Sequence, residues 1–179
     1  MYIIAGQYKG RSIETNSKWI RPTMAKTRAA FFSSLGERIL NADFLDLFCG
    51  SAVMSIEALS RGAHYAVGVD LHIDVAKRNK ETLLVDALTL YRNDSLRAIE
   101  LFAKKQQKFD IIFIDPPYDY SATSALLLSL SKFVILKPSG LLCLETAAKF
   151  DMPQEIGQIS AKNRYDYGQT KLTTYQCKT

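Results

Sequence analysis

Short apolar runs alternate with longer mixed segments along the chain from Asp43 onward. The run from Ile111 to Ile114 is rich in β-branched residues, which is typical of a central strand with both faces covered. The expected strands are 43–48, 65–70, 89–92, 109–115 and 141–145, and the expected helices lie near 52–60, 74–86, 96–105 and 122–132. This alternation predicts an α/β fold with a doubly wound, mostly parallel sheet and right-handed crossovers.

The two ends of the chain depart from this pattern. Residues 156–165 and 171–177 flank Tyr167-Gly168-Gln169, which predicts an antiparallel C-terminal hairpin at one edge of the sheet. Near the start, Ile3-Ile4 and residues 12–15 surround a glycine-containing turn and predict a short N-terminal β-hairpin.

A helix is expected after that hairpin. Thr23 can cap it, and it runs through Leu35. Its apolar stripe comprises Met24, Thr27, Phe31 and Leu35, and Arg28 lies off the stripe. We therefore expect residues 1–40 to form an appendage and residues 41–179 to form the main domain.

Composition limits the alternatives. The chain has 179 residues, of which 47% are hydrophobic, enough for one well-packed α/β domain. It has no apolar stretch of membrane-spanning length and no secretory signal pattern, so we expect a cytoplasmic protein without a membrane partner. Three cysteines and two histidines support neither a disulfide framework nor a metal site.

The net charge of +5 is concentrated at the N-terminus. Residues 1–40 contain seven basic and two acidic side chains, whereas the rest of the chain is balanced. A basic segment on a neutral body favours a polyanionic partner, with phosphate contacts that supply affinity. The alternative is that these side chains only form an ordinary water-exposed surface without a partner.

A carboxylate, two prolines and an aromatic ring follow the strand at 109–115: Asp115, Pro116, Pro117 and Tyr118. Ligands of open α/β sheets bind at the carboxyl ends of the strands. The Asp115 carboxylate and the Pro116 carbonyl are two acceptors for the two donors of a planar amino group, and Tyr118 can stack on its ring. The segment therefore predicts a site for a nucleobase amine or a carboxamide, with a plain turn as the alternative.

A second group of residues is typical of a nucleotide-like cofactor site. Asp46 lies near the end of a strand that enters a small-residue loop, Cys49-Gly50-Ser51-Ala52. Asp70 ends the next strand, where it can accept hydrogen bonds from two ribose hydroxyls. Asp94 follows the third strand and suits an adenine amino group, although an ordinary Asx-turn explains it about equally well.

The loop favours one class of cofactor. A dinucleotide site needs G-x-G-x-x-G, whereas this loop has only Gly50, followed by Ala52 and Ser55. S-adenosylmethionine has no phosphate and carries a sulfonium cation, which an acidic residue such as Asp46 suits.

Several motifs together resemble one family. They are Arg21-Pro22-Thr23 with Arg28, Asp46-Leu47-Phe48-Cys49-Gly50-Ser51, Glu57-Ala58-Leu59-Ser60-Arg61-Gly62-Ala63, Asp70, Asn93-Asp94, Asp115-Pro116-Pro117-Tyr118 and Tyr167-Gly168. In this order they closely resemble the RsmD family of bacterial 16S ribosomal RNA guanine-N2 methyltransferases, over almost the whole chain. The resemblance implies a Rossmann-like, class I methyltransferase that uses S-adenosylmethionine and modifies a guanine of small-subunit RNA.

The resemblance also implies roles for individual residues. Asp115, Pro116, Pro117 and Tyr118 would hold the target base and form the catalytic site. The cofactor would bind Asp46, Phe48, Gly50, Ser51, Asp70, Leu71 and Asp94, with Asp46, Gly50 and Ser51 on its methionine part. RNA would contact Lys9, Arg11, Arg21, Thr23 and Arg28.

One departure from the family pattern concerns the cofactor loop. The family usually has glycine where this chain has Ala52 and again where it has Ser55. If the backbone φ angle at Ala52 is positive, its methyl group costs about 1 kcal/mol. This difference would tune cofactor affinity rather than abolish it.

Other functions stay open from the sequence. The Asp-Pro-Pro-Tyr ending suits any planar amine, so adenine-N6 methylation of DNA or RNA and, less favoured, glutamine methylation are alternatives. A non-catalytic RNA-binding or ribosome-assembly module of the same fold is another. The expected partner is ribosomal RNA, within the small ribosomal subunit, for a monomeric and metal-free protein.

Overall fold

The computed structural model describes residues 1–15, 25–117 and 123–178, apart from the side chain of Lys26. These residues form two compact units, residues 1–93 and 94–179, which are described separately. Residues 1–40 group with the strands that follow them in the first unit. The boundary expected near residue 40 stays a prediction.

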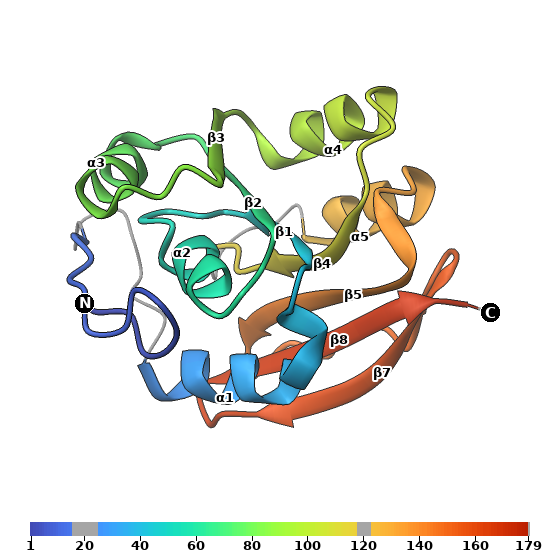
Figure 1. Cartoon of the computed structure of the whole chain (residues 1–179). Coiled ribbons are helices and arrows are strands. Elements are labelled where there is room, and N and C mark those ends of the chain that lie inside the picture. Colours follow the sequence, from blue (N-terminus) through green and yellow to red (C-terminus); the bar gives the residue numbers. More distant parts are fainter. Residues whose placement is uncertain (16–24, 118–122, 179) are drawn as a thin grey trace. The chain divides into compact units, whose positions relative to one another are not determined.

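The first unit contains parallel strands connected by helices (Figure 1). Its elements are α1 (Ala25–Leu35), a 3-10 helix (Gly36–Ile39), β1 (Asp43–Leu47), α2 (Val53–Ser60), β2 (Tyr65–Asp70), α3 (Asp74–Leu83) and β3 (Leu88–Arg92). Strand β2 pairs in parallel with β1 on one side and with β3 on the other. Phe44, Leu45 and Leu47 have no exposed surface, as expected for a strand covered on both faces.

The second unit begins with the same alternation and ends in antiparallel strands. Its elements are α4 (Ser95–Lys104), β4 (Phe109–Ile114), α5 (Thr123–Lys132), β5 (Leu136–Ala147), β6 (Glu155–Ile156), β7 (Ile159–Asp166) and β8 (Thr170–Cys177). Strands β4 and β5 are parallel, whereas β5 with β8, β8 with β7 and β7 with β6 are antiparallel. The α/β class and the C-terminal hairpin are therefore confirmed.

Strand β5 is longer than the sequence indicates. It begins at Leu136, although Pro138 and Gly140 are typical turn residues. Both lie where the register between β4 and β5 shifts, after the pair Phe109 and Leu136. Such an irregularity tolerates proline and glycine inside a strand, and a Cβ atom at Gly140 would lie only 3.0 Å from the Asp110 carbonyl oxygen.

The N-terminal hairpin is present in reduced form. A single antiparallel bridge joins Tyr2 and Ser12. The Ile3 amide donates to the Arg11 carbonyl at 3.0 Å, and the Ile13 amide donates to the Met1 carbonyl at 2.6 Å. Both isoleucines are buried, so packing of these side chains adds to the few hydrogen bonds that hold the two arms together.

The buried face of α1 differs from the expected stripe. Its buried residues are Arg28, Phe31, Phe32 and Leu35, whereas Thr27 is half-buried. The prediction that Arg28 lies off the packed face was wrong, because a buried carboxylate on α2 faces its guanidinium. Thr23, the predicted cap, lies outside the described residues.

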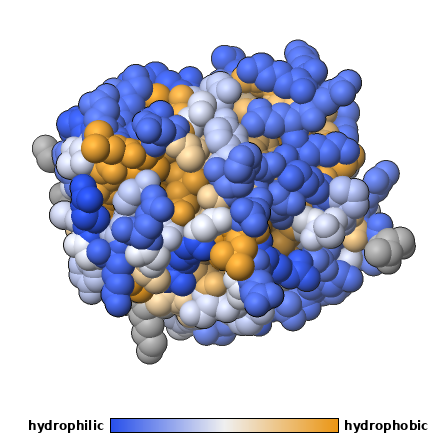
Figure 2. All heavy atoms as spheres, viewed as in Figure 1, coloured by the Kyte–Doolittle hydropathy of each residue, from blue (hydrophilic) through white to orange (hydrophobic). Residues whose placement is uncertain are grey.

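The visible surface is mostly hydrophilic, with separate hydrophobic areas (Figure 2). Large exposed hydrophobic side chains in the described parts include Leu71, Leu84 and Leu128, which are far apart in the sequence. Scattered exposed apolar residues are normal for a globular protein. No helix in the described segments is long and apolar enough to cross a membrane.

Gly6 is expected to be essential for the N-terminal fold. Its φ angle is +83°, and a Cβ atom there would overlap the carbonyl oxygen of Ser60 on α2. We expect Gly6→Ala to lower the free energy of unfolding by about 2–4 kcal/mol through strain and overlap. Chemical denaturation of the full chain measures this change.

Gly10→Ala is the matched control for that variant. Gly10 has a similar φ of +80°, but a Cβ atom added there would have no neighbouring atom within 4 Å among the described residues. Only the backbone strain of about 1 kcal/mol applies there. Equal destabilisation by the two variants would show that the contact with Ser60 is unimportant.

Candidate functional site

The loop between β1 and α2 has an unusual backbone. Three alternate residues have positive φ angles, which are 104° at Phe48, 50° at Gly50 and 62° at Ala52. The amides of Phe48 and Cys49 both donate to the Val69 carbonyl, at 2.9 and 3.0 Å. The positive φ considered for Ala52 is therefore present, and the loop accepts the strain of about 1 kcal/mol that glycine would avoid.

Asp70, at the end of β2, holds this loop in place. Its Oδ2 accepts a hydrogen bond from the Gly50 amide at 2.9 Å, and its Oδ1 accepts one from the His72 amide at 2.9 Å. Each carboxylate oxygen can accept more than one hydrogen bond, so these contacts leave capacity for a ligand. Leu71, the next residue, is 58% exposed. The ribose role of Asp70 stays a prediction.

Asp46 is buried beneath the same loop. It is 1% exposed, and its Oδ2 accepts a hydrogen bond from the Ser55 hydroxyl at 2.8 Å. Burial, and to a lesser extent the charge of Asp70, raise the pKa of Asp46 to about 7, while the Ser55 hydrogen bond opposes this rise. A nearby cation would favour the ionised form of this carboxyl group.

Ser51 gives a direct test of whether the loop suits a polar ligand. Its Oγ is buried and has no hydrogen-bond partner among the described residues. Asn79 of α3 fixes the backbone beside it, because Nδ2 of Asn79 donates to the Ser51 carbonyl and to the Glu14 carbonyl, both at 2.9 Å. An unsatisfied hydroxyl in a rigid loop fits a ligand with polar groups, as the methionine part of S-adenosylmethionine has.

Asp94 has a clear structural role at the start of the second unit. It is the N-cap residue of α4, and its Oδ1 accepts hydrogen bonds from the amides of Leu96 at 3.0 Å and Arg97 at 3.2 Å. The Asx-type alternative considered for Asp94 is therefore present. Its contact with adenine stays a prediction.

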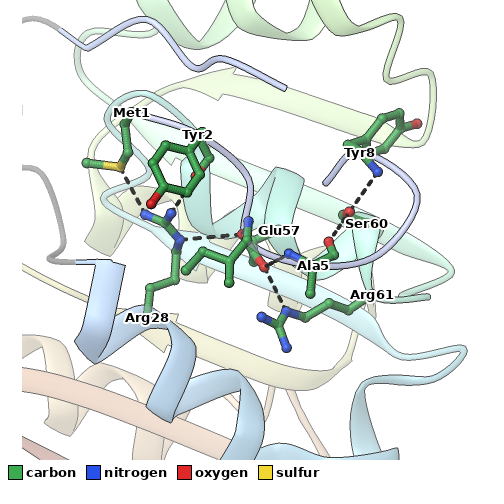
Figure 3. Close-up of polar contacts among 9 residues, drawn as sticks. Met1, Tyr2, Ala5, Tyr8, Arg28, Glu57, Ser60 and Arg61 are labelled. Carbon is green, nitrogen blue, oxygen red and sulfur yellow. Dashed lines mark hydrogen bonds and ion pairs between the residues drawn. The ribbon is translucent and has the colours of Figure 1, made fainter. Parts of the chain in front are cut away.

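Glu57, for which the sequence predicted no role, lies at the centre of a buried polar cluster (Figure 3). It belongs to α2 and has no exposed surface. Its two carboxylate oxygens accept hydrogen bonds from the amides of Ile4 at 2.8 Å and Ala5 at 3.1 Å. Nε of Arg61, one helical turn later, donates to Glu57 Oε1 at 2.8 Å.

Arg28 completes this cluster from α1. Its Nε lies 3.5 Å from Glu57 Oε2, and its terminal nitrogens donate to Met1 Sδ at 2.9 Å and to the Tyr2 carbonyl at 2.6 Å. Burial lowers the pKa of Arg28 below its ordinary value, and the charge of Glu57 opposes this effect. The guanidinium therefore faces protein groups in this structure, and its predicted contact with RNA is untested.

Ser60 holds the next part of the N-terminal segment (Figure 3). Its hydroxyl donates to the Ala5 carbonyl at 2.5 Å and accepts a hydrogen bond from the Tyr8 amide at 2.9 Å. Its carbonyl accepts one from the Gln7 amide at 2.9 Å. The available sequence signal for this cluster was a single charged residue, Glu57, in the otherwise uncharged helical segment Val53–Ser60.

The predicted target-base residues follow β4 in the second unit. Asp115 is half-buried, Pro116 is buried and Pro117 is exposed. Tyr118 lies outside the described residues. The structure thus brings a carboxylate and a rigid, donor-free backbone to the carboxyl end of a buried strand, as the sequence predicts.

The predicted RNA contacts at the N-terminus are described only in part. Lys9 and Arg11 are exposed, on the turn and second arm of the N-terminal segment. Arg21 and Thr23 lie outside the described residues. None of these RNA contacts is tested by the structure.

The fold matches that of a solved putative methyltransferase from Escherichia coli, with a TM-score of 0.86 at 24% identity, covering 99% of this chain and 98% of that one. A solved structure of a hypothetical protein from Thermus thermophilus matches with a TM-score of 0.86 at 23% identity, covering 98% of this chain and 99% of that one. The family model described as "Conserved hypothetical protein 95" matches residues 1–176.

Relatives of known sequence agree with this match. The chain is 34% identical to the Bacillus subtilis (strain 168) protein named "Putative rRNA methyltransferase YlbH", over 98% of both chains. It is 28% identical to Ribosomal RNA small subunit methyltransferase D of Escherichia coli (strain K12), over 97% of this chain and 88% of that protein. The chain belongs to this family of methyltransferases, the RsmD family.

The buried Asp46 is expected to make stability depend on pH. The unfolded carboxyl group ionises near its ordinary pKa of 3.8, whereas the folded one ionises near 7. Between these values the folded state binds more protons than the unfolded state, so the free energy of unfolding falls as pH rises from about 4 to about 7. The fall attributable to Asp46 is on the order of 4 kcal/mol at most.

Chemical denaturation at pH 4 to 8 measures this dependence, with Asp46→Asn as the test variant. Asparagine keeps an acceptor for Ser55 but does not titrate, so its curve should be flatter than that of the wild type across this window. Asp74→Asn, at an exposed ion pair with Arg92, is the control and should leave the slope unchanged. Parallel curves for wild type and Asp46→Asn would rule out the raised pKa.

Proposed function

We propose that this protein transfers a methyl group from S-adenosylmethionine to the exocyclic N2 of a guanine in small-subunit (16S) ribosomal RNA. The observation that carries the proposal is the end of β4, where Asp115 and the Pro116 carbonyl can accept both hydrogens of a planar amine. The names of the relatives, which specify rRNA and the small subunit, support the substrate class.

The proposed cofactor residues are those of the first two strand ends and the start of α4. Asp46, Phe48, Gly50 and Ser51 would contact the methionine part, Asp70 and Leu71 the ribose, and Asp94 the adenine. The unsatisfied Ser51 hydroxyl supports this assignment, because it favours a ligand with polar groups. The cofactor supplies an electrophilic methyl group on a sulfonium sulfur.

Asp115 and Pro116 have two tasks in the proposed reaction. The lone pair of guanine N2 is delocalised into the ring, so hydrogen bonds from its two N–H groups to these acceptors raise the electron density on nitrogen. They also fix the nitrogen for in-line attack, and such positioning contributes on the order of 7–11 kcal/mol. The proton that N2 loses passes to Asp115 or to water.

The RNA must present an unstacked base to these residues. A guanine in folded RNA is stacked or paired, so the proposal includes its rotation out of the stack, with Tyr118 replacing the lost stacking. The exposed Lys9 and Arg11, together with Arg21 and Thr23, are the proposed RNA contacts, whereas the buried Arg28 contacts Glu57 instead. The proposed form of the substrate is the RNA within the small subunit, bound by a monomeric protein.

The direct test is to identify the modified nucleoside. Small ribosomal subunits that lack the modification are incubated with the protein and methyl-labelled S-adenosylmethionine, and the digested RNA is analysed. We expect label in N2-methylguanosine. Label in N6-methyladenosine would contradict the choice of base, and absence of label on subunits, free RNA and DNA would favour a non-catalytic binding module.

Asp115→Ala is expected to reduce turnover by roughly a hundredfold or more, because the target amine loses its charged acceptor. Cofactor affinity, measured by calorimetry, should stay within a few-fold. Asp110→Asn is the control, since Asp110 lies on the same strand but pairs with Lys137 at 2.7 Å near the opposite end. Full turnover by Asp115→Ala would contradict the assignment.

A further inference from the structure

A second carboxylate lies next to the predicted target-base residues. Strands β4 and β5 are parallel, and their last recorded pair is Ile114 with Leu144. Asp115 directly follows the end of β4, and Glu145 is the next residue of β5. Neighbouring strands lie about 4.8 Å apart, and paired residues of parallel strands direct their side chains to the same face. The register therefore places two carboxylates side by side at the carboxyl edge of the sheet.

Glu145 also belongs to a row of residues across β5, β8 and β7. It pairs with Leu172 of β8, which pairs in turn with Tyr165 of β7. Glu145 is 5% exposed, whereas most glutamates are on the surface. Glu145 has a contact within the protein, and each of its two carboxylate oxygens can accept more than one hydrogen bond. At the ligand-binding edge of the sheet, an N–H group of a bound base can be a further donor to it.

Tyr167 lies at the same end of these strands, in the turn between β7 and β8. Its pKa is raised mainly by burial and further by the charges of Tyr165 and Glu145, so Glu145 is within electrostatic reach of the tyrosine. An aromatic ring near a carboxylate is a suitable surface for a flat, hydrogen-bonding base.

The two purine candidates differ in the hydrogen-bonding groups next to the reactive amine. In guanine, N1 carries a hydrogen and lies beside the N2 amino group, so these two neighbouring positions are both donors. In adenine, N1 carries a lone pair beside the N6 amino group. A row of acceptors therefore matches guanine, whereas a carboxylate opposite adenine N1 would meet another acceptor and lose its hydrogen bond.

We propose that Glu145 is a specificity-determining residue that accepts a hydrogen bond from N1–H of the target guanine, while Asp115 and the Pro116 carbonyl hold the N2 amino group. This inference rests on the proposed function. The Asp-Pro-Pro-Tyr ending alone does not distinguish guanine from adenine. The inference assigns this discrimination to Glu145 on β5. Rejection of a base that leaves a buried acceptor unpaired is a strong form of discrimination.

The test compares two target bases in wild type and Glu145→Gln. Small subunits are reconstituted with rRNA in which the mapped target guanosine is retained or replaced by 2-aminopurine ribonucleoside. 2-Aminopurine keeps the amino group at C2 but has no hydrogen on N1. The side-chain amide introduced by Glu145→Gln offers a donor as well as an acceptor, so it can pair with either form of N1.

We expect wild type to prefer guanosine and Glu145→Gln to lose on the order of tenfold or more of that preference in kcat/KM. 2-Aminopurine also lacks O6, but this difference affects wild type and variant alike. It therefore cancels when the guanosine preference of the variant is divided by that of wild type. Glu155→Gln is the matched control, because Glu155 is exposed and pairs with Lys178 at 2.7 Å on the surface. Its preference should equal that of wild type.

The alternative outcomes are distinct. An unchanged preference in folded Glu145→Gln, with normal cofactor affinity, would overturn the role of Glu145 while leaving the proposed function intact. A wild-type protein that modifies no guanosine would overturn the proposed function itself. If Glu145→Gln methylates neither base, the dissociation constants of the two RNAs are compared instead, measured by 2-aminopurine fluorescence and by competition. A ratio of dissociation constants equal to that of wild type would then overturn the role of Glu145.

Discussion

The buried carboxylate of Glu57 is the interaction on which the first unit depends. A carboxylate without exposed surface is costly unless it is paired and hydrogen-bonded, and here the amides of Ile4 and Ala5 and the side chain of Arg61 satisfy it, with Arg28 at 3.5 Å. Loss of the Glu57 carboxylate would leave the buried Arg28 guanidinium without this counter-charge. This constraint explains why residues 1–15 are fixed against α2 although a single β-bridge joins their two arms.

The same N-terminal segment also supports the proposed cofactor loop. Asn79 joins the two, because its side chain binds the backbone of Glu14 and of Ser51 at once. Asp70 fixes the loop from the other side through the Gly50 amide. Contacts within the protein therefore fix the backbone of the loop, and such preorganisation reduces the ordering cost of binding.

The sequence predicted the strands and helices well where local pattern decides, as in β2 and α5. It failed where a distant partner decides. Arg28 is charged, so its burial on α1 was not predictable without knowledge of the carboxylate on α2. The strand expected at 141–145 begins earlier, at Leu136, because a register shift between β4 and β5 accommodates Pro138. Among the proposed site residues, Asp115 and Asp70 were predicted from the sequence because carboxylates at strand ends are conspicuous, whereas Glu145 was not predicted because it follows an apolar run without a break.

The proposed role of Glu145 would let the sheet itself select a base. A specificity loop needs additional residues and must be ordered when the substrate binds, which costs conformational entropy. Two neighbouring parallel strands need no additional residues and no ordering step, because their register fixes the spacing of the residues that follow Ile114 and Leu144. Acceptors placed in this way are as rigid as the sheet itself. The choice of purine would then be set by the strand register, and the basic N-terminal segment would need only to bring the RNA to the protein.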